Sequence, residues 1–166
     1  MTTTLMTAIN SNNLEEVNHL IRQGIDVNEL DTNQEAPVII AAYKGYNSIL
    51  AALLKAGADV RAVDPGMKAT ALHAAAYAGR TEAARLLIQY NIDIDKQGPY
   101  NGYTALHDAI WQGHEDLAAL LIDAGASLKL KSHTGETALD FAKKRHQMAI
   151  VTLIQQKISE SHMEIQ

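Results

Sequence analysis

The sequence contains no cysteine, and this absence removes several kinds of chemistry from consideration. Without thiols the chain forms no disulfide, offers no thiolate ligand to zinc and has no cysteine nucleophile. It also lacks a glycine-rich phosphate-binding loop, a nucleophile elbow and an HExxH zinc motif. We therefore expect a protein that is not an enzyme and that carries no metal and no other cofactor.

Long hydrophobic runs are lacking as well. The longest apolar stretches, such as PVIIAAY at residues 37–43, are far shorter than the roughly 20 residues that span a bilayer. The N-terminal segment MTTTLMTAINSNN has neither a basic region nor a long apolar stretch, so no secretory signal is expected. The sequence thus predicts no membrane contact and a cytoplasmic location, with export as a secreted effector as the alternative.

The chain has little positive charge. Its formal net charge is −5. Residues 1–128 carry 8 Lys and Arg against 15 Asp and Glu, whereas residues 129–166 carry 6 against 4. A domain that binds duplex nucleic acid presents a dense basic face, because neutralising phosphates supplies much of its affinity. No face of that density is expected here, so nucleic acid is not a predicted partner.

What the sequence does contain is an internal repeat. TALHAAAYAGRTEAARLLI, which begins at Thr70, returns as TALHDAIWQGHEDLAALLI at Thr104, a shift of 34 residues. In the same register, related segments begin at Thr3, Ala36 and Thr137. The repeats make residues 1–166 a single domain, with approximate units at 3–31, 32–64, 65–97, 98–131 and 132–158 and a C-terminal tail at 159–166.

Each unit predicts two short helices. A threonine stands at the first position of four of the five units, where its hydroxyl can cap the first helix. The helix then meets a slot suited to positive φ, occupied by Asn12, Gly45, Gly79, Gly113 and His146. Because helix pairs this short bury their apolar faces only by stacking on their neighbours, the sequence predicts an all-α solenoid.

The units resemble ankyrin repeats. TALHAA and TALHDA are similar to the family's T-P-L-H-x-A pattern, and the period of 33 to 34 residues is the family's. The resemblance implies an ankyrin-repeat solenoid of five helix-turn-helix units joined by short β-hairpin-like fingers. It also implies a non-catalytic module, monomeric on its own, that binds another protein through its concave face and fingers as an adaptor, inhibitor or effector.

An aromatic row is the feature that the repeat does not require. Tyr43, Tyr77 and Trp111 occupy one slot at intervals of 34 residues, and the resemblance places this slot and the next on the concave face. Tyr and Trp are frequent in binding hot spots because they bury much area while keeping a polar tip. We predict that the partner protein contacts eight residues, namely Tyr43, Lys44, Met67, Tyr77, Tyr100, Tyr103, Trp111 and Gln112.

A second hypothesis concerns ALHDAIWQGHED at residues 105–116. His107 and His114 are seven residues apart and would share a face of an unbroken helix, so that with Asp108 they could form a metal-dependent active site. The repeat register argues against this, because Gly113 falls at the helix-ending slot between them. The resemblance moreover gives the imidazole at the His107 slot a hydrogen bond to the finger.

A third hypothesis is a nucleic-acid binder that uses the basic C-terminal repeat. It depends on KKRH at residues 143–146, which holds three fixed positive charges. The interpretation that we favour is simpler: cations near the C-terminus of a helix complement its dipole and stay solvated.

Overall fold

The fold is a row of helix pairs. The computed structural model describes residues 4–165, and within that range the chain forms ten helices. They are α1 (Leu5–Asn10), α2 (Leu14–Arg22), α3 (Pro37–Lys44), α4 (Asn47–Lys55), α5 (Ala71–Ala78), α6 (Thr81–Gln89), α7 (Ala105–Gln112), α8 (Glu115–Asp123), α9 (Ala138–Lys144) and α10 (Met148–Met163).

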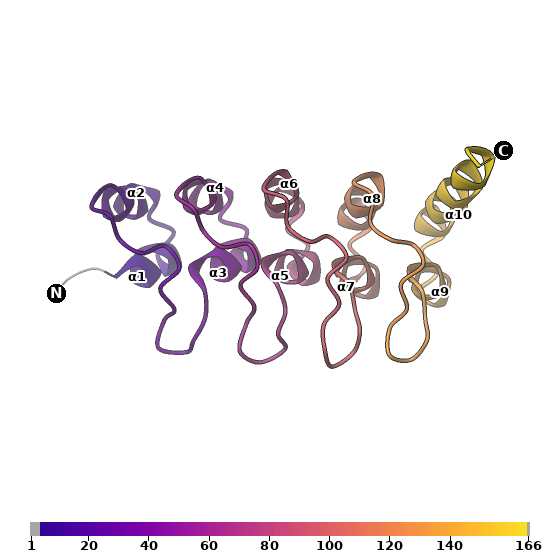
Figure 1. Ribbon diagram of the computed structural model, residues 1–166, viewed down its shortest axis with the longest axis horizontal. Helices are drawn as coiled ribbons and strands as arrows, with labels where there is room; N and C mark the ends of the chain where they lie inside the picture. The colour runs from indigo at the N-terminus through magenta and orange to yellow at the C-terminus, as the bar shows by residue number, and fades with distance from the viewer. Residues whose placement is uncertain (1–3, 166) are drawn as a thin grey trace.

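Two layers run along the whole row. The first helix of each pair (α1, α3, α5, α7 and α9) belongs to one layer, and the second helix belongs to the other (Figure 1). The loops that join successive pairs all extend on the side of the first helices. This arrangement confirms the predicted all-α repeat solenoid.

The connections between pairs are loops, and the expectation of β-hairpin-like fingers was wrong. In the described residues the one isolated backbone bridge joins Val63 to Thr70, and no strand forms around it. In this loop a side chain accepts N–H groups of the backbone: the carboxylate of Asp64 accepts hydrogen bonds from Gly66, Met67 and Ala69. A short polar side chain that bonds its own loop in this way favours a turn over paired strands.

Buried threonines fix where α5 and α7 begin. The hydroxyl of Thr104 accepts the backbone N–H of His107, while Nδ1 of His107 accepts the backbone N–H of Thr104. Thr70 and His73 form the same reciprocal pair at the start of α5. Two helix N–H groups are satisfied each time, which confirms the predicted caps.

The other units vary this cap. At α9 the carboxylate of Asp140 takes the place of the imidazole and accepts the N–H of Thr137. At α3 the cap position is Ala36, which makes no side-chain bond. In the first unit the predicted position, Thr3, lies outside the described residues, and the neighbouring Thr4 caps α1.

The helix-ending slots have the predicted backbone conformation. All five residues have positive φ: 52° at Asn12, 71° at Gly45, 71° at Gly79, 81° at Gly113 and 57° at His146. At the C-terminal end the structure differs from the sequence-based boundary. Helix α10 continues through Met163, so most of the segment predicted as a tail is helical.

Small side chains let the first helices approach one another. Ala41, Ala75, Ala109 and Ala142 occupy one slot of successive repeats and are fully buried. Larger residues such as Leu53, Leu87 and Leu121 fill the space between the layers and are fully buried too. The buried apolar side chains form one cluster that extends from α1 to α10. The core is therefore shared between neighbouring pairs rather than closed within each.

A polar side chain before each of the second helices α6 and α8 ties one repeat to the previous one. Nε of Arg80 donates to the carbonyl oxygen of Tyr43 at 3.0 Å, and Nε2 of His114 lies 3.1 Å from the carbonyl oxygen of Tyr77. These bonds satisfy carbonyls at the ends of α3 and α5, where the helix itself supplies no donor.

Replacing the buried cap of α7 should lower stability. We expect Thr104→Ala to lower the free energy of unfolding by about 1–2 kcal/mol, because the N–H of His107 loses its acceptor. Thr4→Ala, which removes an exposed cap of the terminal helix α1, is the control and should cost only about 0.5 kcal/mol. Urea unfolding followed by circular dichroism measures both; equal losses would contradict the role assigned to Thr104.

Candidate functional site

A groove of about 660 Å³ lies against the first helices of the second, third and fourth pairs. Its walls come from α3, α5 and α7 and from the loops that precede them. Six of the eight predicted contact residues line it: Tyr43, Met67, Tyr77, Tyr103, Trp111 and Gln112. The structure thus brings together on one surface residues that are spread over three repeats.

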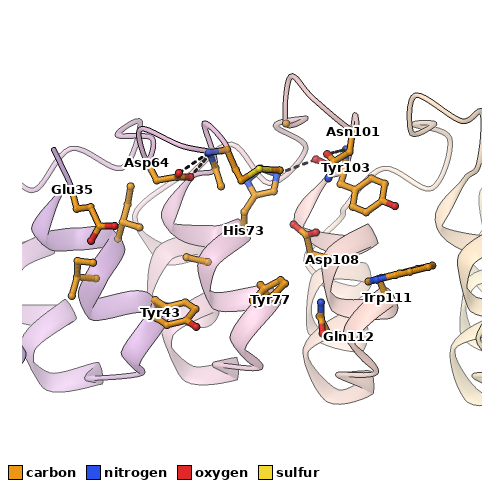
Figure 2. Close-up of a pocket in the computed structure, with 16 residues that line it drawn as sticks. Glu35, Tyr43, Asp64, His73, Tyr77, Asn101, Tyr103, Asp108, Trp111 and Gln112 are labelled. Carbon is orange, nitrogen blue, oxygen red and sulfur yellow. Dashed lines mark hydrogen bonds between the residues drawn. The ribbon is translucent and has the colours of Figure 1, made fainter. Parts of the chain in front are cut away.

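The aromatic row is present and mostly exposed. Figure 2 shows the rings of Tyr43, Tyr77 and Trp111 one after another along the helices that line the groove. The exposed fraction is 49% for Tyr43, 54% for Tyr77 and 39% for Trp111. No aromatic pair within residues 4–165 joins these three rings to one another, so they form a row of separate rings and not a stacked ladder.

Trp111 is held in place by the last repeat. Its ring centroid lies 5.7 Å from that of Phe141, and the guanidinium carbon of Arg145 lies 5.0 Å from the Trp111 centroid. Arg145 belongs to the basic run at 143–146, and its neighbour Lys144 forms an ion pair with Glu136 at 2.8 Å. Two of the three fixed charges in that run are therefore engaged within the protein.

Tyr103 is more a core residue than a surface contact. Its ring stacks on His107 at 5.8 Å and meets the edge of Phe141 at 5.2 Å. The side chain is half-buried and packs on the hydrophobic core. It still lines the groove, so a partner would touch only part of this ring.

The two remaining predicted contacts lie outside the groove lining. Nζ of Lys44 lies 5.9 Å from the ring centroid of Tyr46, in its own repeat. Tyr100 is 62% exposed at the loop before α7, where its backbone carbonyl oxygen lies 3.1 Å from Nδ1 of His133. Neither Lys44 nor Tyr100 lines the groove.

His73, which lines the groove, and His107, at the same slot of the next repeat, have structural roles. Nε2 of His73 lies 3.0 Å from the carbonyl oxygen of Tyr103, and Nε2 of His107 lies 3.2 Å from that of Glu136. Each imidazole thus ties its helix to the following loop, as the repeat resemblance implied. Burial lowers the pKa of both rings, which keeps them neutral at pH 7.

The two histidines of the metal hypothesis, His107 and His114, have partners within the protein. Both ring nitrogens of His107 have partners in the protein. His114 follows the turn at Gly113 that ends α7, and its Nε2 lies next to the carbonyl oxygen of Tyr77. Over residues 4–165 no group of three His, Asp or Glu side chains is arranged to hold a metal ion. The same part of the chain has no helix that is long and apolar enough to cross a membrane.

The comparison with protein families agrees with the architecture. A family model described as ankyrin repeats (3 copies) matches residues 1–64 and 62–132, which is well over half of the chain. The chain belongs to the ankyrin-repeat family. Ankyrin repeats are generally protein-protein interaction modules, and the family is generally non-catalytic. A search of the curated proteins found no match.

Ten of the sixteen residues that line the groove of this ankyrin-repeat chain were not predicted as contacts, and Asp108 is one of them. Asp108 lines the groove from α7, at the slot that holds Ile40 and Ala74 in the two preceding repeats and Phe141 in the next. Burial raises the pKa of its carboxyl from 3.8 to about 7. A carboxylate at a slot that is apolar in the second, third and fifth repeats was the signal in the sequence, where Asp108 enters only the metal hypothesis.

Asp108 should make the protein less stable as the pH rises. Between about pH 4 and pH 7 the folded state keeps the proton that the unfolded chain loses, so ionisation penalises the fold. We expect Asp108→Ala, which restores the residue type of the third repeat, to raise the free energy of unfolding by about 2 kcal/mol at pH 8 and hardly at pH 4.

Asp140 provides a control of opposite sign. Hydrogen bonds from the backbone N–H and hydroxyl of Thr137 lower the pKa of the Asp140 carboxyl, so its contribution to stability is present at neutral pH and is lost on acidification. Asp140→Ala should therefore destabilise the protein at pH 8 and much less near pH 3. Urea unfolding at each pH measures both variants, and a destabilised Asp108→Ala at pH 8 would contradict the account of Asp108.

Proposed function

We propose that this chain is a non-catalytic binding module that holds a partner protein in the groove of its second, third and fourth repeats. The observation that supports the proposal best is the exposure of three large aromatic side chains, Tyr43, Tyr77 and Trp111, at one slot of three successive repeats. An ankyrin repeat needs no aromatic ring at this slot for its core. Exposed aromatic patches of this kind are typical of protein-binding surfaces.

The frame behind the rings favours tight binding. The carbonyls of Tyr43 and Tyr77 accept hydrogen bonds from the following repeat, and the ring of Trp111 packs against Phe141 and Arg145. A surface that is already ordered loses little conformational entropy when a partner binds. Contacts on such a surface therefore contribute to affinity with little offsetting cost.

The mode of action that we propose is occupation of the partner's surface. A module of this kind acts as an adaptor, an inhibitor or an effector, by bringing the partner to another site or by covering part of it. The proposed contacts are the six groove residues, with Lys44 and Tyr100 at the rim. The net charge of −5 favours a protein over nucleic acid as the partner. We further propose that the module is a cytoplasmic monomer.

Removing two groove rings should weaken partner binding without unfolding the protein. We expect Tyr43→Ala combined with Tyr77→Ala to weaken binding of a specific partner by at least about 10-fold, since each ring loses a large contact area. Affinity purification from the native cell, followed by mass spectrometry, compares the variant with the wild type.

Tyr90→Ala is the matched control for this experiment. Tyr90 is 42% exposed at the end of α6 and does not line the groove, so its loss should leave the partner bound. Circular dichroism checks that both variants are folded. If the double variant keeps every partner that the wild type retains, the groove is not the binding site.

A further inference from the structure

The charges of the groove have one sign. Three carboxylates, those of Glu35, Asp64 and Asp108, line it, and no lysine or arginine does. The one histidine in the lining, His73, has its pKa lowered by burial and is neutral at pH 7. A partner that fills this groove therefore meets negative charge and aromatic rings.

The carboxylates differ in how far the protein itself satisfies them. Asp64 accepts three backbone N–H groups of its own loop, which accounts for its presence. The Asp108 carboxylate forms no hydrogen bond and no ion pair with any residue from 4 to 165, and desolvation by burial is the cause of its raised pKa. Its carboxylate is thus available from the groove and lacks a counter-charge.

The unpaired Asp108 carboxylate lowers the stability of the fold, and the repeat does not need a carboxylate at this slot. The same slot holds Ile40 and Ala74 in the preceding repeats, so the solenoid accepts an apolar side chain there. A half-buried carboxylate without a partner destabilises the folded chain, and groups of this kind are frequent at binding sites. The missing counter-charge is what a ligand can supply.

We propose that the groove recognises a basic side chain, arginine or lysine, of a partner protein segment, and that this side chain pairs with Asp108 beside Tyr77 and Trp111. The inference rests on the proposed function and adds the chemistry of the partner. Figure 2 places Asp108 on α7 near Trp111, with Tyr77 on the neighbouring helix. Ring faces attract cations, so the same side chain that offsets the charge of Asp108 also packs favourably on the row.

Other occupants fit less well. An acidic segment would bring like charges to Asp108, Glu35 and Asp64 with no cation in the lining to receive it. A purely apolar segment would exclude water from the Asp108 carboxylate without replacing it by a hydrogen-bond donor. Charge complementarity therefore selects a basic side chain, with Glu35 at the α3 end available to a second one.

Peptide selection against the full chain tests the partner chemistry directly. A random 12-residue peptide library displayed on phage is selected on the wild-type protein, and enriched peptides are synthesised in two forms. One form keeps each arginine or lysine, and the other replaces it by citrulline or acetyl-lysine. The affinities of both forms are then measured by titration calorimetry for the wild type, for Asp108→Ala and for Asp123→Ala.

The expected result is a coupling between one peptide cation and Asp108. Enriched peptides should share a basic residue whose neutralisation weakens binding to the wild type by about 10-fold or more, and to Asp108→Ala by less than about 2-fold. Asp123→Ala removes the same charge from an exposed position on α8, outside the groove, and should behave like the wild type.

The two proposals fail in different ways. Peptides that lose affinity for the Tyr43→Ala, Tyr77→Ala double variant but show no basic residue, or no coupling to Asp108, would overturn the basic-side-chain inference and leave the groove as a binding site. A selection that enriches no sequence, or only sequences that bind the double variant as tightly as the wild type, would contradict the proposed function and this inference with it.

Discussion

The structure depends on stacking between helix pairs that are each too short to bury their own apolar faces. Most of the helices have six to nine residues, a length at which an isolated helix is marginal in water. Ala41, Ala75, Ala109 and Ala142 are fully buried because the first helix of a neighbouring pair lies against each of them. This contact sets the distance between repeats, and with it the spacing of every side chain at a given slot. The aromatic row is a consequence: the same slot, repeated, becomes a line on the surface.

Polar groups complete what the apolar stacking begins. His73 and His107 join their helices to the next loop, and Arg80 and His114 join the next repeat to the ends of α3 and α5. Each of these side chains has a backbone partner in a neighbouring repeat, so the fold depends on it. Residues without such a partner can change without loss of the fold. Function in a solenoid of this kind is therefore expected at slots such as those of Tyr77 and Asp108, where the repeat makes no demand.

The sequence predicted what is local and repeated, and missed what depends on neighbours in space. The register, the buried caps and the positive-φ slots follow from short patterns, and the structure confirms them. The expected β-hairpin-like fingers are loops, and in two of them Asp31 and Asp64, which are 33 residues apart, accept N–H groups of their own loop. The repeat pattern shows that the two carboxylates share a slot but not which N–H groups they accept. Six of eight predicted contacts line one groove because they share slots or loops; Lys44 does not, since its side chain lies near the ring of Tyr46. The sequence grouped Asp108 with the two histidines because its surroundings in the groove come from α5 and the loops, which a helical spacing cannot show.

The last helix pair contacts a residue of the groove in addition to closing the core. Phe141 and Arg145, which lie beyond the residues that the family model matches, supply the ring and the cation that hold Trp111. A ring already paired with Arg145 has less to offer a second cation, whereas Tyr77 has no cation within the described residues over its face. In the proposed complex the partner's basic side chain is thus directed toward Tyr77 and Asp108, and Trp111 contributes apolar contact at the edge. The tryptophan is the most conspicuous residue of the row, but the charge that distinguishes one partner from another lies one helical turn before it, at Asp108.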